Sequence, residues 1–226
     1  MDTLFRQLAP VLQRDLSYFP VLTLTGPRQS GKTTLLRELL SPDWDYVNLE
    51  DPGAREFALS DPKGFINSYA RSVIIDEVQR APELLSIIQL VVDREKKPGR
   101  FILSGSHNLL LLQGVSQSLA GRTSIRHLLP LSYQELSQYQ PSSLDETLFY
   151  GGFPPIFERR ASSVSWHDSY IQTYVERDVR MIRQVSDLTT FQRFLRLCAG
   201  RAAQLLDLSS IAGDAGVSHN TVRDWI

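Results

Sequence analysis

Short runs of β-branched and aromatic residues alternate with longer segments of helical periodicity through the first 130 residues. The runs, which predict strands, span residues 21–25, 46–49, 72–76, 101–104 and 124–129. The segments between them, which predict helices, span residues 32–40, 53–69, 82–93 and 109–119. This alternation is typical of βαβ crossovers, which place helices on both faces of a parallel sheet. The nearly continuous apolar runs "VIID" and "FIL" fit strands that are buried on both faces.

The pattern changes after Pro130. Helical periodicity continues over residues 131–139, 163–186 and 189–203, and a Gly/Pro-rich loop, "GGFPPIFERR", interrupts it at residues 151–160. An amphipathic segment over residues 1–20, which predicts a helix, precedes the first strand. We therefore divide the chain into a core over residues 1–130, a helical region over 131–203 and a final segment over 204–226.

The final segment contains "LSSIAGDAGVSHNTVRDWI", which predicts two short helices around a turn at Gly216. Ser218 is expected to cap the second helix, and this arrangement is typical of a helix-turn-helix. The sequence ends inside that second helix, so the winged helix that such a pair begins would be incomplete. From this pattern we expect the chain to be a piece of a longer protein.

The segment "GPRQSGKT", residues 26–33, matches G-x-x-x-x-G-K-[ST] at every fixed position. It also lies between a predicted strand and a predicted helix, which argues against an ordinary turn. Glycines let successive backbone N–H groups face one point, where the positive end of the helix also lies. Lys32 would reach the β- and γ-phosphates of a nucleotide, and the Thr33 hydroxyl would hold Mg²⁺. We expect nucleotide contacts from Gly26, Pro27, Arg28, Gln29, Ser30, Gly31, Lys32, Thr33 and Thr34.

The segment "SVIIDEVQRAPELL" ends a buried strand on Asp76 and Glu77. Two acids at the end of a core strand are costly unless a cation or a polar site is close. Asp76 would support Mg²⁺ through its water shell, and Glu77 would orient or deprotonate an attacking water. The alternative is a strand that simply ends on surface acids.

Two further segments carry candidate residues. The segment "RFILSGSHN" predicts an extra strand between the phosphate-loop strand and the Asp-Glu strand, with Ser104 or Ser106 at its polar tip. Either hydroxyl could contact the γ-phosphate or the water, and a plain turn is the alternative. Arg122 follows a helix and a glycine, and positive charge aimed at the γ-phosphate speeds hydrolysis by about 10³–10⁵-fold. Arg122 would act within its own chain or on a neighbouring chain, unless it forms only a surface salt bridge.

Other nucleotide chemistries fit less well. The guanine-binding pattern Asn-Lys-x-Asp is absent from the sequence, and the D-x-x-G match at Asp61–Gly64 lacks an apolar strand before it. A small-molecule kinase would not need Glu77 to activate water. The four histidines show no spacing typical of metal ligands, so we predict no zinc site. The residues therefore favour hydrolysis of ATP.

Composition limits the alternatives only slightly. The chain has 226 residues, of which 42% are hydrophobic and 22% charged, with a net charge of −1. These values are ordinary for a globular protein and do not indicate a general polyanion binder. The sequence has one cysteine, Cys198, and we find neither a membrane span nor a signal peptide. We therefore expect a cytoplasmic protein.

The motifs together resemble the AAA+-type P-loop ATPases of bacteria and archaea in which an AAA_14 domain is followed by a DUF4143 region. The segments that carry the resemblance are "GPRQSGKTTLL", "VIIDEVQRAPELL", "FILSGSHNLLL", "SLAGR", "PLSYQEL", "GGFPPIFE" and "YVERDVR". The resemblance implies an additional-strand P-loop core in a three-layer αβα sandwich, followed by a helical lid, a winged-helix-like segment and a nuclease-like C-terminal domain. "GGFP" is also similar to the Gly-x-Pro motif of related switch ATPases, which implies that Pro154 touches the adenine base.

We therefore predict an ATPase that uses ATP and Mg²⁺ as a switch or motor and is weak or stimulated by a partner. A DNA or protein partner and a homo-oligomer stay open. The alternative is a nucleic-acid-binding regulator in which Ser218, His219, Asn220 and Arg223 face the groove and ATP is a ligand.

Overall fold

The computed structural model describes residues 5–40, 44–106, 114–115, 117–139, 143–159, 162–175 and 187–226. The chain divides into two compact units, Met1–Ala161 and Ser162–Ile226, and each is described by itself. The predicted boundaries at residues 130 and 203 are not tested by this division and stay predictions. Within the described residues, no helix is both long and apolar enough to cross a membrane.

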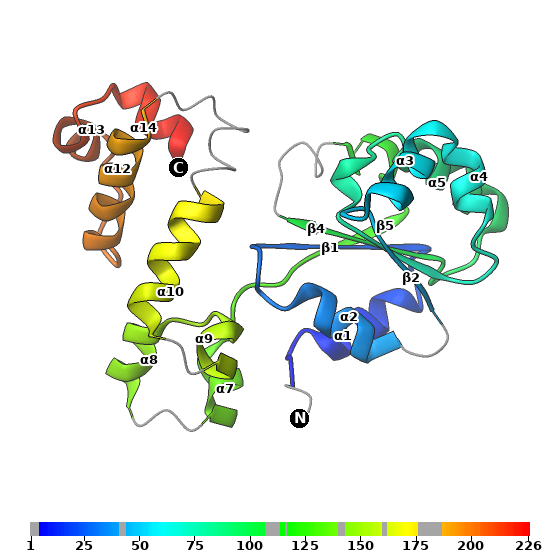
Figure 1. Ribbon diagram of the computed structural model, residues 1–226, viewed down its shortest axis with the longest axis horizontal. Coiled ribbons are helices and arrows are strands. Elements are labelled where there is room, and N and C mark those ends of the chain that lie inside the picture. Colours follow the sequence, from blue (N-terminus) through cyan, green and yellow to red (C-terminus); the bar gives the residue numbers. More distant parts are fainter. Residues whose placement is uncertain are drawn as a thin grey trace. The chain divides into compact units, whose positions relative to one another are not determined.

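A parallel sheet of five strands forms the centre of the first unit (Figure 1). The strands are β1 (Val21–Gly26), β2 (Asp45–Asn48), β3 (Val73–Asp76), β4 (Phe101–Ser106) and β5 (Thr123–His127). Their order across the sheet is β2-β3-β4-β1-β5. Phe101 of β4 is in register with Val21 of β1 on one side and with Val73 of β3 on the other. The predicted extra strand between the phosphate-loop strand and the Asp-Glu strand is therefore confirmed.

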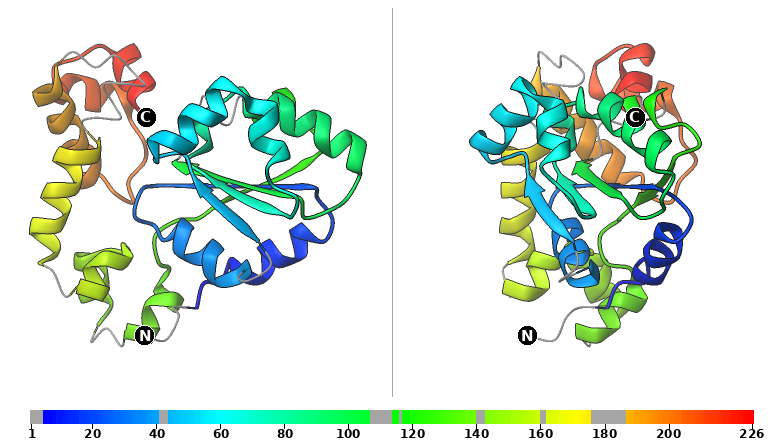
Figure 2. Two further views of the ribbon diagram at one scale, coloured as in Figure 1. Left: turned by 45° about the vertical axis from the view of Figure 1, so that its right-hand side comes forward. Right: turned by 90° about the vertical axis from the view of Figure 1, so that its right-hand side faces the viewer.

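Helices cover both faces of this sheet, as Figure 2 shows from two sides. On one face, α1 (Ala9–Leu16) and α2 (Lys32–Leu40) pack on a cluster that includes Leu22, Leu24 and Ile102. On the other face lie α3 (Pro52–Ser60), α4 (Pro62–Asn67) and α5 (Leu84–Glu95), whose apolar side chains join Ile75, Phe101 and Leu103. Successive strand residues point to opposite faces, so β1, β2, β3 and β4 each contribute to both clusters. The predicted three-layer αβα sandwich is confirmed.

The helix predicted over residues 53–69 is wrong in one respect, because the structure has two helices there. The break lies at Asp61 and Pro62. The Asp61 carboxylate accepts a hydrogen bond from the Gly64 N–H at 2.9 Å and so begins α4. Pro62 has no N–H to continue the preceding helix but suits the first turn of a new one. This capping also accounts for Asp61–Gly64 without any nucleotide contact.

Short helices follow the sheet within the first unit. They are α7 (Tyr133–Leu136), the 3₁₀ turn η2 (Ser137–Tyr139), α8 (Leu144–Tyr150) and α9 (Pro154–Arg159). The loop predicted over residues 151–160 is therefore shorter than expected, because α9 begins at Pro154. Proline favours the first position of a helix, where its missing N–H has no partner in any case.

The second unit begins with α10 (Ser163–Tyr170), which continues into a π-helical turn, η3 (Ile171–Val175). Three further helices are α12 (Leu188–Gly200), α13 (Leu208–Ala215) and α14 (His219–Trp225). Phe191 and Phe194 of α12 pack against Trp225 at 5.1 and 5.2 Å between ring centroids. α12 thus buries the apolar face that the α13–α14 pair could not bury alone. Residues 176–186, which include most of "YVERDVR", lie outside the described residues, as do residues 109–113 and 116 of the predicted helix over 109–119.

Candidate nucleotide site

The loop between β1 and α2 has a backbone that only glycine can easily supply at two positions. Gly26 has φ 155°, and Gly31 has φ 92°. A methyl group added to Gly26 would lie 2.2 Å from the Leu128 carbonyl oxygen, which is too close for any side chain. The loop is therefore held against the end of β5, and its curl depends on these glycines.

Lys32, the first residue of α2, turns its side chain back into this loop. Its Nζ donates to the carbonyl oxygens of Gly26 and Pro27, both at 2.9 Å, and the residue is 7% exposed. Burial lowers the pKa of Lys32, while the negative charges of Glu77 and Asp76 oppose that change. A cation is therefore held at the centre of the loop, beside the two predicted acids.

Asp76, at the end of β3, is the hub of the site. Its Oδ2 accepts hydrogen bonds from the Thr33 hydroxyl at 2.7 Å and from the Tyr46 hydroxyl at 2.9 Å. Its Oδ1 accepts one from the Ser104 hydroxyl. Asp76 is 3% exposed. The structure therefore brings the phosphate loop and the Asp-Glu strand to the same edge of the sheet, as the carboxyl ends of parallel strands require.

Glu77 lies beside this hub in a left-handed backbone conformation, with φ 57° and ψ 40°. The amide nitrogen of Gln79 donates to Glu77 Oε2 and also to the Ser106 hydroxyl, the latter at 3.3 Å. Such a conformation is uncommon for a residue with a long side chain and is found at functional sites. Glu77, Gln79 and Ser106 thus form a second polar group next to Asp76.

The two candidate serines of β4 have different partners. Ser104 is fully buried and bonds to Asp76, whereas Ser106 bonds to Gln79. Both lie at the carboxyl edge of the sheet, and the structure connects each with one of the two acids. The sequence did not decide between Ser104 and Ser106. In the structure the two hydroxyls bond to different residues.

Arg122, predicted to act within its own chain or on a neighbouring chain unless it forms only a surface salt bridge, lies at the amino ends of the strands, opposite the phosphate loop. Its carbonyl oxygen accepts a hydrogen bond from the N–H of Val21, the first residue of β1. β1 needs about 17 Å, at about 3.3 Å per residue, to run from there to the phosphate loop. The Arg122 side chain instead forms two hydrogen bonds with Asp93, at 2.5 and 2.9 Å. Arg122 therefore does not approach the nucleotide site of its own chain.

Pro154 does approach the phosphate loop. A methyl group placed on Gly31 would lie 3.9 Å from Pro154 Cγ and 3.3 Å from Arg6 Nη1. Of the other predicted contacts, Pro27 and Arg28 are half-buried, Gln29 and Thr34 are exposed, and Ser30 is buried. Within the part of the chain that the structure describes, the buried Ser30 hydroxyl has no hydrogen-bond partner. This leaves a polar atom of the loop available to a ligand.

Sequence reasoning missed Tyr46 and Gln79. Tyr46 is on β2, which is separated from β1 and its loop by β3 and β4, and the guanidinium of Arg37 lies 4.0 Å above its ring. Burial, together with the charge of Asp76 and the hydrogen bond to it, raises the pKa of Tyr46 to about 12. The only signal for either residue was its position, Tyr46 in the predicted strand beside Asp76 and Gln79 just after Glu77.

In the helix-turn-helix segment, the predicted cap at Ser218 is confirmed, whereas the predicted contacts with a nucleic-acid groove gain no support. The Ser218 hydroxyl accepts a hydrogen bond from the Thr221 N–H at 3.0 Å, so it caps α14. Residues 208–226 contain one arginine, Arg223, against Asp214 and Asp224, a net charge of −1 with His219 neutral. Nucleic-acid binding depends on positive charge, which this helix pair does not supply.

The β2-β3-β4-β1-β5 sheet, with its glycine loop closing on Asp76, defines the class of P-loop ATPase-like domains. The chain belongs to the AAA domain family, whose model matches residues 18–137. Residues 141–226 match a domain of unknown function, DUF8612. The predicted DUF4143 region is not confirmed.

Two uncharacterized mycobacterial proteins, Mb2031c of Mycobacterium bovis and Rv2008c of Mycobacterium tuberculosis, are each 33% identical to this chain over 225 residues. The matches cover 98% of this chain and 50% of each relative, so the chain spans about half the length of these relatives. Among solved structures, the Walker-type ATPase PABY2304 of Pyrococcus abyssi has a TM-score of 0.58 and 15% identity. That alignment covers 95% of this chain and 89% of the other, and it supports the fold.

Proposed function

We propose that this chain binds ATP with Mg²⁺ and hydrolyses the γ-phosphate bond, as a switch or motor coupled to a partner. The observation that carries the proposal is the 2.7 Å hydrogen bond between the Thr33 hydroxyl and Asp76 Oδ2. It joins two segments, 43 residues apart in the sequence, that would together form the proposed magnesium-nucleotide site. An ordinary βα turn would not need this contact or the buried ammonium of Lys32.

The residues at this point fit a magnesium ion. Hydroxyl and carboxylate oxygens are the ligand types that Mg²⁺ prefers, and Thr33 and Asp76 present both within 2.7 Å. Thr33 would hold the ion directly, and Asp76 would hold its water shell. When bound, Mg²⁺ would neutralise charge on the β- and γ-phosphates.

The chain's own groups have distinct roles in the proposed reaction. The loop N–H groups and Lys32 bind the phosphates and offset their charge. Glu77 accepts a proton from, or orients, the attacking water, and Gln79 orients Glu77 through the hydrogen bond between them. Ser106, which shares the Gln79 amide, is the better placed of the two serines to contact the γ-phosphate or the water.

Two parts of the proposal concern residues outside this cluster. Pro154 would contact the base, which its closeness to Gly31 supports. Arg122 would act on the nucleotide of a neighbouring copy; the alternative is that it only forms the surface salt bridge with Asp93 that the structure shows. The role on a neighbouring copy requires a homo-oligomer. Measuring the size of the protein with and without ATP tests for the oligomer. Measuring turnover and nucleotide affinity of Arg122→Ala tests the role of the side chain, because this change should lower turnover without lowering affinity.

The first test is Lys32→Ala, which removes the cation from the centre of the loop. Each charge-assisted hydrogen bond to phosphate contributes about 1.5–3 kcal/mol, so we expect affinity for Mg-ATP to fall by about 10–100-fold or more. Calorimetric titration measures this. Lys63→Ala, in the exposed first turn of α4, is the matched control and should bind as the wild type does. Equal affinity in the two variants would contradict the proposed site.

The second test is Glu77→Gln, which keeps the shape of the side chain but removes its basicity. We expect nucleotide binding to persist while phosphate release falls by about 10²–10⁴-fold, the usual contribution of a general base. Single-turnover phosphate release measures the chemical step. If wild type and Glu77→Gln hydrolyse ATP equally, Glu77 is not the residue that activates water.

A further inference from the structure

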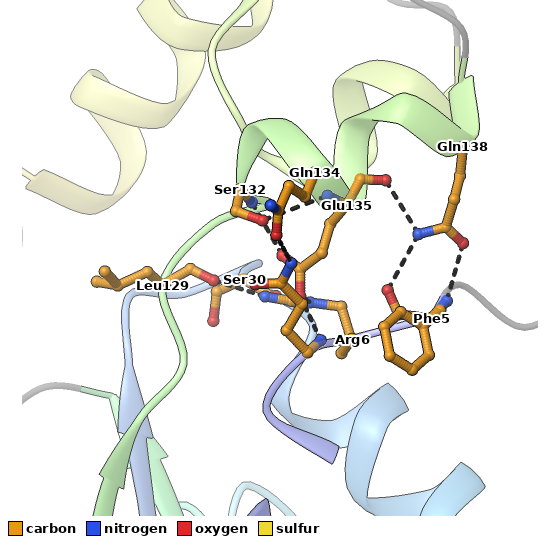
Figure 3. A network of polar contacts seen from close by, with 9 residues as sticks. Phe5, Arg6, Ser30, Leu129, Ser132, Gln134, Glu135 and Gln138 are labelled. Carbon is orange, nitrogen blue, oxygen red and sulfur yellow. Dashed lines mark hydrogen bonds and ion pairs between the residues drawn. The ribbon is translucent and has the colours of Figure 1, made fainter. Parts of the chain in front are cut away.

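Arg6 connects four separate segments of the first unit (Figure 3). Its Nη1 donates to the carbonyl oxygen of Ser30 in the phosphate loop at 2.7 Å. Its Nη2 donates to the Leu129 carbonyl oxygen, after β5, at 2.7 Å. Its Nε donates to Glu135 Oε1, in α7, at 3.1 Å. One guanidinium therefore joins the N-terminal segment, the phosphate loop, the strand exit and the first helix after the sheet.

Arg6 and Glu135 form a buried ion pair at the centre of this network. The side chains of Arg6 and Glu135 are each 6% exposed. Glu135 also accepts from the N–H groups of Gln7 at 2.7 Å and Ser132 at 2.9 Å. Burial raises the pKa of Glu135, but these two N–H groups and the charge of Arg6 more than offset that and hold it below its usual value. The carboxylate thus stays ionised beside Arg6.

The bond to Ser30 fixes an orientation that matters for phosphate binding. In a trans peptide the carbonyl and the following N–H point in opposite directions. Because Arg6 holds the Ser30 oxygen toward itself, the N–H of Gly31 must point away from Arg6. The loop binds phosphate through N–H groups such as this one, so its geometry depends on Arg6.

We propose that Arg6 is a positioning residue for the phosphate loop and that Glu135 makes this positioning depend on the docking of α7. The inference rests on the proposed nucleotide binding and adds a residue and a regulatory link to it. Linkage is reciprocal, so a nucleotide in the loop would in turn favour the docked position of α7. A partner that pulled α7 away would release the nucleotide.

The chain offers a matched control for the loss of an N-terminal ion pair. Arg126 of β5 pairs with the buried Asp15 of α1 at 2.6 Å, and Ser124 also donates to Asp15 at 2.6 Å. This pair joins the N-terminal segment to the sheet just as Arg6 does. The described side-chain contacts of this pair lie in α1 and β5, outside the phosphate loop, so its loss should lower stability without changing the geometry of the loop.

The experiment measures the dissociation constant of the non-hydrolysable analogue Mg-AMPPNP by calorimetry on the 226-residue chain. Wild type is compared with Arg6→Gln, Glu135→Gln, the double variant and the control Arg126→Gln, all well below their melting temperatures. We expect about tenfold weaker binding for each Arg6 or Glu135 variant, which corresponds to one lost buried hydrogen-bond partner. The double variant should be no weaker than Arg6→Gln, because both changes break one network.

The outcomes separate this inference from the proposed function. If wild type binds no nucleotide, the proposed function fails. If wild type binds and Arg6→Gln binds equally well, or if Arg126→Gln loses as much affinity, the positioning role is overturned. If Arg6→Gln does not fold, Arg6→Lys replaces it, because lysine keeps the charge but cannot hold three acceptors in this geometry. Unchanged affinity in Arg6→Lys and Glu135→Gln together would equally overturn the role.

Discussion

At the scale of single residues, Asp76 is held by three hydroxyl groups, and Tyr46 is the least expected of them. Its hydroxyl hydrogen bond helps to orient the Asp76 carboxylate, which also accepts hydrogen bonds from the hydroxyls of Thr33 and Ser104 and from the N–H of Glu77. Thr33 would exchange this bond for Mg²⁺ in the proposed complex, whereas Tyr46 would not have to move. Tyr46 would therefore keep Asp76 in position while the ion binds and leaves.

The pKa of Tyr46 gives this role a pH signature. The pKa is about 12 in the folded chain, raised first by burial and then by Asp76, against 10.0 for an unperturbed tyrosine. Because the folded pKa is the higher one, the stability that Tyr46 contributes is present below pH 10 and is lost as pH rises through 12. The difference in unfolding free energy between wild type and Tyr46→Phe should therefore shrink between pH 10 and 12. Urea unfolding measures it, and Tyr18→Phe, at an exposed tyrosine, is the control for removing a tyrosine hydroxyl.

The predicted site residues were those that share a local motif. The spacing of a loop and the end of a strand fix the positions of four of them, so these could be predicted: Lys32, Thr33, Asp76 and Glu77. Tyr46, Gln79 and Arg6 could not, since their roles come from contacts across the sheet or between distant segments. Arg122 was a candidate because of its positive charge. That it lies at the amino ends of the strands follows only from the register of β5 with β1.

At the scale of elements, the curled loop after β1 depends on Gly26. Alanine there would place a methyl group 2.2 Å from the Leu128 carbonyl, in a backbone conformation that side chains rarely adopt. We expect Gly26→Ala to destabilise the chain by about 1–3 kcal/mol and to weaken nucleotide binding. Thermal unfolding and calorimetric titration measure the two effects. Gly53→Ala is the control, since Gly53 lies in the first turn of α3 and its added methyl group meets Asp51 only at 3.4 Å. Equal stability in the two variants would show that the loop can shift away from β5.

The strands and their order were predictable, because apolar runs and βαβ alternation leave few arrangements of a parallel sheet. The errors lie where capping overrode periodicity. The apolar pattern over residues 53–69 continues through Asp61 and Pro62, yet the carboxylate and the proline ring end one helix and begin the next. Pro154 likewise begins α9 in a segment whose glycines and prolines suggested a loop.

At the scale of the whole molecule, the two compact units have separate apolar clusters, and only the first contains the proposed nucleotide site. A ligand stabilises the part of the chain that binds it, by about 2.7 kcal/mol at a hundredfold excess over its dissociation constant. Tryptophans can report on each unit, because Trp44 packs against a cluster of the first and Trp225 against that of the second.

Two variants with a single tryptophan make this measurable. One keeps Trp44 and replaces Trp166 and Trp225 with phenylalanine; the other keeps Trp225 and replaces Trp44 and Trp166. With excess Mg-AMPPNP, the Trp44 transition should rise by about 5–10 °C, as about 2.7 kcal/mol predicts for a unit of this size. The Trp225 transition should not move, because its cluster of Phe191 and Phe194 holds no part of the phosphate loop. An equal rise in both signals would mean that the units unfold together, and nucleotide binding would then act on the entire chain.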